Sequence, residues 1–307
     1  RARCTSCLFP LKGKSETSYS IAKNLFGENM MKPWWLANFI LLQVVLVSTL
    51  NASAADKRLR VTVKRWLEVR QPIGQVLHSS GKKSQPARSG LKLQAVGDAI
   101  ITKQNSSAVL AIDIGTGFIK VSENTNINIQ KLERGRGGEQ ITQLQVKAGQ
   151  VRLQVRQFTH PGSRLEIKSP AGVAGVRGTD FGVNVQQNGS MGVATLTGGV
   201  ATNAQGKTVL VKAGFQNITI PGQPPSKPVP LKDNTDLNIR QLSASGNQVR
   251  IIGSVDPVNL LIIAKQERNT DVNGKFDITI PLLPNRRVDA VVVTPLGKKQ
   301  LYELAVP

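Results

Sequence analysis

The chain contains few of the residues that most catalytic and metal sites require. Among its 307 residues there are two cysteines, Cys4 and Cys7, and two histidines, His78 and His160. One Cys-x-x-Cys pair cannot complete a four-ligand zinc site, and neither histidine has an obvious nucleophile or carboxylate beside it in the sequence. With no cysteine after residue 7, packing alone must stabilise the folded chain. The sequence therefore predicts no enzyme, no metal site and no cofactor.

A secretory signal is predicted ahead of the folded part. A short positively charged stretch leads into the apolar run 34–50, which ends before the small-x-small site Ala52-Ser53-Ala54. We expect translation to start at Met30 or Met31, residues 1–54 to be upstream leader plus signal peptide, and cleavage after Ala54 to leave a periplasmic or secreted protein. A single-pass membrane anchor is the alternative, because the run approaches the length that spans a bilayer.

Positive charge is abundant, whereas aromatic residues are scarce. The net charge is +21, and aromatic residues make up 4% of the chain. A basic surface attracts polyanions, but so few rings supply few stacking platforms for nucleic acid. We therefore expect an exported protein to bind cell-envelope polysaccharide, peptidoglycan or an envelope protein, with a solvated cationic face that has no specific partner as the alternative. The candidate polyanion-binding residues are Lys57, Arg58, Arg60, Lys64, Arg65 and Arg70.

Short apolar or alternating runs after residue 90 predict all-β structure. Val151, Leu153 and Val155 alternate with polar residues, as expected of a half-buried strand. The string Val-Lys-Ala-Gly occurs at 146–149 and again at 211–214, which fits strand ends stacked in a solenoid-like fold. Before these runs, residues 55–90 are expected to form a basic strand within 60–69 and a polar loop at 78–90.

The C-terminal part is predicted to be a separate module. Five prolines between residues 220 and 230 favour an extended linker. Residues 236–307 follow as a small β-sandwich that resembles bacterial immunoglobulin-like modules, with strands expected at 248–253, 259–265, 275–280, 288–294 and 300–306. Within it, Asn273-Gly274 favours a type I′ hairpin over a calcium loop.

The segment Ser169–Val185, with the sequence SPAGVAGVRGTDFGVNV, is the most distinctive of the chain. Its glycines free the backbone to turn or to approach another strand, while Phe181 and Val183 alternate with Gly182 and Asn184. This pattern is typical of a tightly packed β-turn-β unit. Arg177 and Asp180 are expected to pair with each other or to cap the turn.

This segment resembles the core motif of the FecR family of bacterial envelope proteins. Segments 96–98, 105–110, 112–116 and 213–216 resemble further parts of the domain, which would span residues 91–230 and end in the proline-rich linker. The motif residues are Pro170, Gly172, Val173, Ala174, Val176, Arg177, Gly178, Thr179, Asp180 and Phe181.

The resemblance implies an all-β fold, with a FecR-type solenoid-like β domain followed by the small immunoglobulin-like β-sandwich. In founding members of the family this domain is the periplasmic sensor half of a membrane protein that signals to a sigma factor. Few residues precede the apolar run here, too few for a helical sigma-binding domain. We therefore expect a non-catalytic periplasmic or cell-envelope binding or scaffold protein, with a membrane-anchored regulator as the alternative.

Overall fold

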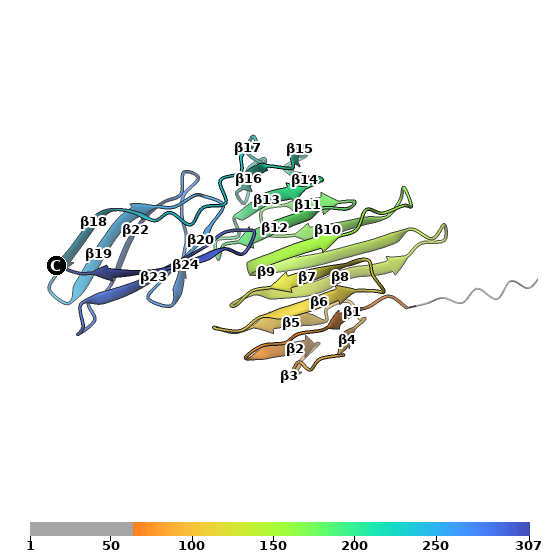
Figure 1. Ribbon diagram of the computed structural model, residues 1–307, viewed down its shortest axis with the longest axis horizontal. Helices are drawn as coiled ribbons and strands as arrows, with labels where there is room; N and C mark the ends of the chain where they lie inside the picture. The colour runs from red at the N-terminus through yellow and green to blue at the C-terminus, as the bar shows by residue number, and fades with distance from the viewer. Residues whose placement is uncertain (1–63) are drawn as a thin grey trace, which may run out of the picture. The chain divides into compact units, whose positions relative to one another are not determined.

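The structure, a computed structural model, describes residues 64–307 (Figure 1). All regular elements in this range are β-strands, which confirms the predicted all-β class. Residues 64–230, the large β domain, contain β1 Leu67–Val69, β2 Val76–Ser80, β3 Lys83–Pro86, β4 Lys92–Leu93, β5 Ala99–Thr102, β6 Ala108–Ile112, β7 Gly117–Val121, β8 Asn126–Arg134, β9 Gln140–Val155, β10 Arg164–Lys168, β11 Val173–Val176, β12 Asp180–Val185, β13 Met191–Thr197, β14 Gly199–Ala204, β15 Lys207–Lys212, β16 Phe215–Thr219 and β17 Val229–Pro230.

The strands of the large β domain lie in two layers that share β9. The first layer has the order β4-β1-β6-β7-β9-β12-β13-β16-β17. The second has the order β3-β2-β5-β8-β9-β10-β11-β14-β15. Neighbouring strands are antiparallel except β9 and β10, which are parallel. Because the strand order in both layers largely follows the chain, successive strands are stacked from one end of the domain to the other, as Figure 1 shows.

Strand β9 passes from one layer to the other at Gly149. Its first part pairs with β8 and β10, and its second part pairs with β7 and β12. Gly149 has a φ of +100°, which favours glycine, and a Cβ there would overlap the side chain of Thr125. The change of layer therefore requires a residue without a side chain at this position.

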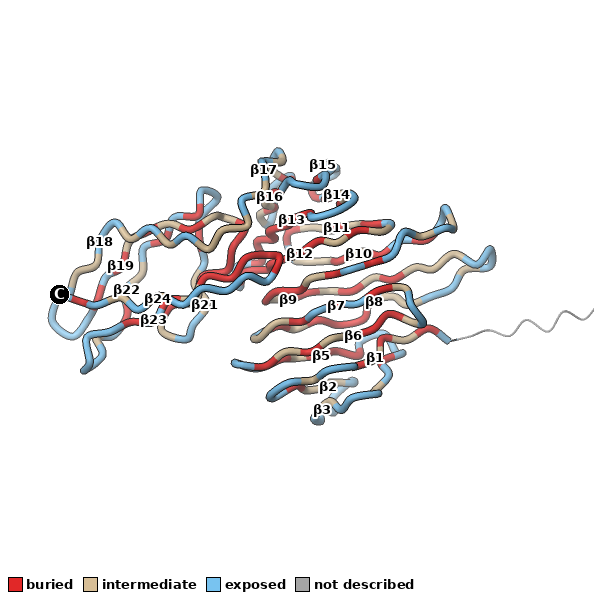
Figure 2. The backbone as a smooth tube through the Cα atoms, in the orientation of Figure 1, coloured by how far each residue is buried: buried red, intermediate tan, exposed pale blue. Residues whose placement is uncertain are grey.

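The core of the large β domain lies between the two layers (Figure 2). Val151 and Leu153 of β9 point into it, as the alternating pattern predicts, and Arg152 between them points outward. Phe181 of β12 is fully buried and is the largest side chain at the centre. Because aliphatic side chains fill most of the rest, burial of apolar surface is the dominant stabilising contribution.

Residues 236–307, the C-terminal module, form two sheets around a core of their own. One sheet has the order β18-β19-β22 and the other β21-β20-β23-β24. The strands are β18 Asn238–Ser245, β19 Gln248–Ser254, β20 Leu260–Ile263, β21 Gln266–Arg268, β22 Lys275–Pro281, β23 Arg287–Val293 and β24 Lys299–Ala305. The five expected strand positions all contain strands, and β18 and β21 were not expected. The immunoglobulin-like relationship stays a prediction.

Three local expectations were wrong. Residues 78–90 are not only a loop, because β2 and β3 form a hairpin around Gly81. The first Val-Lys-Ala-Gly string lies inside β9 rather than at a strand end. Asn273-Gly274 joins strands of different sheets, and only Gly274 has a positive φ, so the turn is not of type I′. For β9, pairing with strands far away in the sequence extends the strand through the repeated string.

The expected signal segment and its cleavage site lie outside the described residues. Between residues 64 and 307 there is no helix that is long and apolar enough to cross a membrane.

Candidate functional site

The distinctive segment lies at the centre of the large β domain. Ala174 and Val176 of β11 and Phe181 of β12 are buried in the core. Gly178 has a φ of +141°, and a Cβ there would overlap the backbone of Gln157. Backbone hydrogen bonds in both directions join Thr179 to Val155 of β9. These motif residues therefore hold the two layers together around the core.

The two charges of the motif do not pair with each other, contrary to the sequence interpretation. Asp180 accepts hydrogen bonds from Nε and Nη2 of Arg152, both at 3.0 Å. Burial alone would raise the pKa of Asp180, but the bonds from Arg152 and Gln154 outweigh it and keep that pKa below its ordinary value. Arg177 instead donates to the backbone oxygen of His160. The partners come from β9 and the loop after it, which sequence distance within the motif could not indicate.

The outward face of β12 packs against the C-terminal module. Gly182 packs so closely beneath the module that a Cβ would overlap the carbonyl oxygen of Pro295. Asn184 donates from Nδ2 to the carbonyl oxygens of Val258 and Val293, at 2.9 and 3.0 Å. Both β12 residues are buried. One face of β12 therefore packs in the core, and the other face contacts the C-terminal module at the junction.

Further polar contacts extend this junction. Nε2 of Gln186, the next outward residue along the chain, donates to Oγ1 of Thr270 at 3.1 Å, and its Oε1 accepts from the backbone nitrogen of Thr270 at 3.1 Å. On β16, which is separated from β12 by β13 in the first layer, the Nε2 of Gln216 donates to both carboxylate oxygens of Asp256 at 2.9 Å. Side-chain amides thus bind groups of the C-terminal module along both strands.

Ion pairs complete the junction. Lys299 of β24 pairs with Glu123 in the turn after β7. Burial alone would raise the pKa of Glu123, but its bonds with Lys299 and the backbone nitrogen of Asn105 outweigh this and lower it. Lys298 pairs with Asp233 at 2.9 Å.

The candidate polyanion-binding residues differ in location and exposure. Lys57, Arg58 and Arg60 lie outside the described residues, and Lys64 is exposed. Arg70 is exposed and pairs with Glu68 at 3.0 Å.

Arg65 is buried, which the sequence interpretation did not foresee. It pairs with Asp113 at 2.7 Å and donates to the backbone oxygens of Glu133 and Ile141 and to Oγ1 of Thr142. Its guanidinium group is therefore occupied inside the protein and is not part of the exposed basic surface.

A cationic groove lies at the end of the strands where β6 turns into β7. It consists of two adjoining hollows of about 310 and 170 Å³. Lys64, Arg134 and Arg156 line it, and none of them has a carboxylate within ion-pair distance among the described residues. Within residues 64–307 these three cations have no ion-pair partner, whereas Arg65, which also lines the smaller hollow, is paired with Asp113.

Apolar and hydrogen-bonding groups accompany these cations. Ile114 in the β6–β7 turn is 88% exposed, and Trp66 lines the same hollow. The Nε1 of Trp66 is buried without a hydrogen-bond partner, and the ammonium group of Lys92 lies 4.4 Å from its ring centre. His160 lines the other hollow, and its Nδ1 accepts from the backbone nitrogen of Gly162. A ligand with charged and apolar parts would find both kinds of contact here.

The other histidine lies beside a carboxylate that the sequence pattern did not reveal. The Nε2 of His78 is 3.8 Å from Oδ1 of Asp98. Burial alone would raise the pKa of Asp98, but hydrogen bonds from Ser80 and from the backbone nitrogens of Ala95 and Gln94 outweigh it and lower that pKa. Within residues 64–307 no group of three His, Cys, Asp or Glu side chains could hold a metal ion.

Comparison with known proteins gives a limited set of relatives. No curated protein matches the chain. Two crystal structures from Parabacteroides distasonis ATCC 8503, each described as a "putative anti-sigma factor", share 13% sequence identity with it, with TM-scores of 0.35 and 0.34. Each alignment covers 43% of this chain and 57% of the other, so the chain spans little more than half the length of these proteins. TM-scores this low do not establish a shared fold.

A family model gives a firmer result. The model described as FecR protein matches residues 98–201, a narrower range than the 91–230 expected from the motifs. The matched range runs from just before β5 into β14 and includes all of β9 and β12. Residues 98–201 of the large β domain therefore match the FecR family, as the sequence motifs indicated.

Proposed function

We propose that the protein is a non-catalytic binding protein of the cell envelope, which holds an acidic polymer in the cationic groove of its FecR domain. The observation that carries this proposal is the set of unpaired cations, Lys64, Arg134 and Arg156, beside the exposed Ile114. The FecR domain supports a regulatory rather than a metabolic role.

The chemistry of the groove favours a carboxylated or phosphorylated polymer. Guanidinium groups bind carboxylate and phosphate oxygens through two parallel hydrogen bonds. Trp66 and Ile114 supply apolar contact for the uncharged faces of sugar rings. Because the groove is open to solvent, its affinity depends on salt.

Cosedimentation with purified peptidoglycan and with alginate, at low and high salt, tests the proposal. We expect salt-sensitive binding that the double substitution Arg134→Gln and Arg156→Gln weakens about tenfold, because bonds to charged groups are lost. The double substitution Lys212→Gln and Arg240→Gln removes the same charge from exposed sites outside the groove. An equal loss in this control would show diffuse attraction, and no binding to either polymer would contradict the proposal.

A membrane-anchored regulator of sigma-factor signalling is the second candidate, favoured by the FecR domain and the apolar run 34–50. Amino-terminal sequencing of the protein recovered from the envelope separates the two. A start at Ala55 supports the exported binding protein. A chain that retains residues 34–50 supports the regulator.

A further inference from the structure

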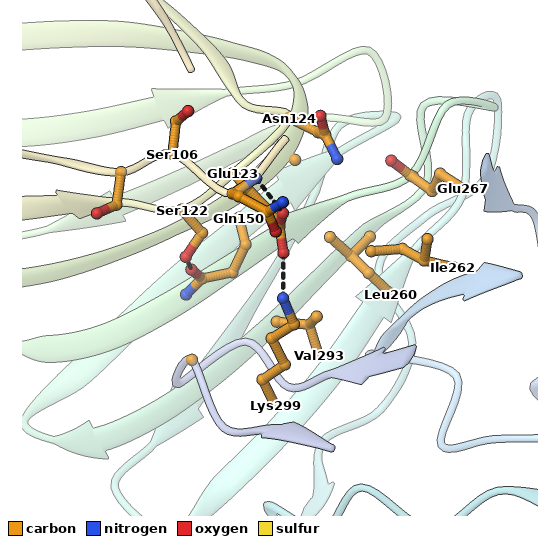
Figure 3. A pocket seen from close by; sticks show the side chains of 14 residues that line it. Ser106, Ser122, Glu123, Asn124, Gln150, Leu260, Ile262, Glu267, Val293 and Lys299 are labelled. Carbon is orange, nitrogen blue, oxygen red and sulfur yellow. Dashed lines mark hydrogen bonds and ion pairs between the residues drawn. The ribbon is translucent and has the colours of Figure 1, made fainter. Parts of the chain in front are cut away.

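A second cavity lies at the other end of β7, between the FecR domain and the C-terminal module (Figure 3). Its volume is about 250 Å³. The FecR domain contributes the turn 122–124 and Gln150, and the C-terminal module contributes residues of β20, β21, β23 and β24. Neither module forms this cavity alone, and junctions between modules are a common location for ligand sites.

One side of the cavity is apolar. Leu260 and Ile262 of β20 form this side together with Val293 of β23. Figure 3 shows Leu260 and Ile262 next to each other, opposite the turn that carries Glu123. A ligand that fits here needs an apolar portion of modest size.

Most polar groups of the cavity already have partners. Glu123 pairs with Lys299, and its second oxygen accepts from the backbone nitrogen of Asn105 at 2.7 Å. The hydroxyl of Ser122 bonds to the side chain of Gln150. These groups form the wall of the cavity. The charges of Glu123 and Lys299 compensate each other, and Ser122 and Gln150 satisfy each other's hydrogen bonds.

Glu267 is the exception. Its Oε1 accepts from the backbone nitrogen of Gln187 at 3.0 Å, but no cation lies within 4 Å of this carboxylate in the described part of the chain. Burial raises its pKa to about 7, although the bond from Gln187 lowers it slightly. Glu267 is half-buried, and even partial burial of a carboxylate without a cationic partner is unfavourable, which makes this group a candidate for ligand binding.

Asn124 places an amide on the same side of the cavity. Its backbone has a φ of 53°, and Figure 3 shows its amide nitrogen and the Glu267 carboxyl group facing the space above Leu260 and Ile262, with the amide oxygen directed away. The side chain of Asn124 makes no hydrogen bond within residues 64–307. A carboxylate without a cationic partner, a side-chain amide without a hydrogen bond within residues 64–307 and an apolar side are thus brought together.

We propose that this cavity binds a primary amine carried on a short apolar chain. The ammonium group donates to Glu267 and, once the Asn124 amide rotates to turn its oxygen inward, also to Asn124. The chain packs on Leu260 and Ile262. An anion would be repelled by the Glu267 carboxylate, and a purely apolar ligand would cover this half-buried carboxylate without supplying a cation. Because both modules line the cavity, the bound amine also strengthens their junction.

The site has a defined pH dependence. The amine stays protonated up to about pH 10, as a lysine side chain does, whereas Glu267 ionises near pH 7. The other charged groups around the cavity are Glu123 and Lys299, which pair with each other, and Lys265 and Arg268, which line an adjoining hollow with Glu267. Amine affinity should therefore rise from pH 5.5 to pH 8.

Titration of the full-length protein with n-butylamine, followed by calorimetry in an amine-free buffer, tests the proposal. We expect binding at pH 8 that is at least tenfold weaker at pH 5.5, because most Glu267 side chains are then protonated. Butan-1-ol and butyrate, which have the same chain length, should bind at least tenfold more weakly than the amine.

Two substitutions assign the binding to this cavity. Glu267→Gln keeps the shape of the side chain and should reduce amine affinity at pH 8 at least tenfold. Asn124→Gly preserves the left-handed backbone and should reduce it about threefold. Glu303→Gln, at an exposed site on β24, is the matched control and should have no effect.

Equal affinity in the Glu267→Gln variant, equal binding of butan-1-ol, or no amine binding at millimolar concentration would overturn the proposal. Polymer binding by the groove is measured separately, so failure of one proposal is distinguishable from failure of the other.

Discussion

The two ends of strand β7 use charge in different ways. At the end that precedes Gly117, Arg134 and Arg156 face the groove without ion-pair partners among the described residues. At the end that follows Val121, Glu123 is paired with Lys299. Cationic side chains thus remain free to attract a ligand at one end of β7, whereas at the other end a cationic side chain joins the two modules.

This difference shows why composition alone does not locate a binding surface. The net charge of +21 is a property of the whole chain, whereas unpaired cations are a property of particular places. Arg65 and Arg134 look alike in the sequence, but the first is buried against Asp113 and the second is exposed.

The largest effect is expected from Arg65→Met, beneath the groove. Asp113 and two backbone oxygens would lose their buried partner, which should cost about 3 kcal/mol of unfolding free energy. Urea denaturation measures the loss, and Arg70→Met, at an exposed pair, should cost less than about 1 kcal/mol. Although Arg65 and Asp113 line the smaller hollow of the groove, Arg65→Met should reduce polymer affinity of the folded protein less than the double substitution Arg134→Gln and Arg156→Gln does. A large loss of affinity at full folding would instead make Arg65 a binding residue.

Gly182→Ala should disrupt the junction next most strongly. The added Cβ would overlap Pro295, so the C-terminal module must shift away, at a cost of about 2–3 kcal/mol. Thermal denaturation and limited proteolysis at the junction should both reveal the change. Gly175→Ala, in the same motif, is the control, because its Cβ would meet only ordinary contacts at 3.9 Å. Equal stability of the two variants would contradict the close approach at Gly182.

Asn184→Ala should have an intermediate effect. It leaves the carbonyl oxygens of Val258 and Val293 without their donor in a buried place, which costs about 1–3 kcal/mol. Chemical denaturation and hydrogen exchange of the C-terminal module measure it. Asn203→Ala, on β14 at an exposed site, provides the comparison. If both variants unfold at the same denaturant concentration, the amide does not hold the module.

The smallest effect concerns the pH dependence of stability. The pKa of Glu267 is about 7 in the folded protein against an ordinary value of 4.5, so between these values the folded state retains a proton that the unfolded chain releases. Stability from this group is therefore present below pH 4.5 and is lost as the pH rises through 7, by an amount on the order of 1 kcal/mol. Urea midpoints at pH 5.5 and pH 8 in an amine-free buffer should show a smaller change in Glu267→Gln. Identical pH dependence of the two proteins would argue against the raised pKa.

Sequence patterns were informative where local alternation decides the structure. Val151 and Leu153 identified the second part of β9, and the glycine-rich motif identified the FecR domain. The junction was not predicted, because the partner of Asn184 at Val293 lies 109 residues away. The outward positions Gly182, Asn184 and Gln186 did carry a signal, since a glycine and two amides replace the charged residues usual on a solvated face. That signal becomes interpretable only when the covering module is known.

The sequence predicted that a basic surface would exist, but it did not predict where the groove lies. Lys64 was among the candidates, but Arg134 and Arg156 were not, because they come from the ends of β8 and β9 and meet through turns separated in the sequence. Long-range strand pairing brings them together, and no spacing within a short segment encodes it.

The passage of β9 through both layers also sets the order in which the FecR domain can assemble. Strands β1–β8 pair among themselves, strands β10–β17 pair among themselves, and within the described residues the two groups are joined by strand pairing only through β9. A chain that ends after Val155 would leave the edges for β10 and β12 open in both layers at once. Such a fragment has two unpaired edges on a single strand, and open edges promote association between chains. A shortened or slowly completed chain is therefore expected to aggregate through β9 until residues 164–185 arrive to cover it.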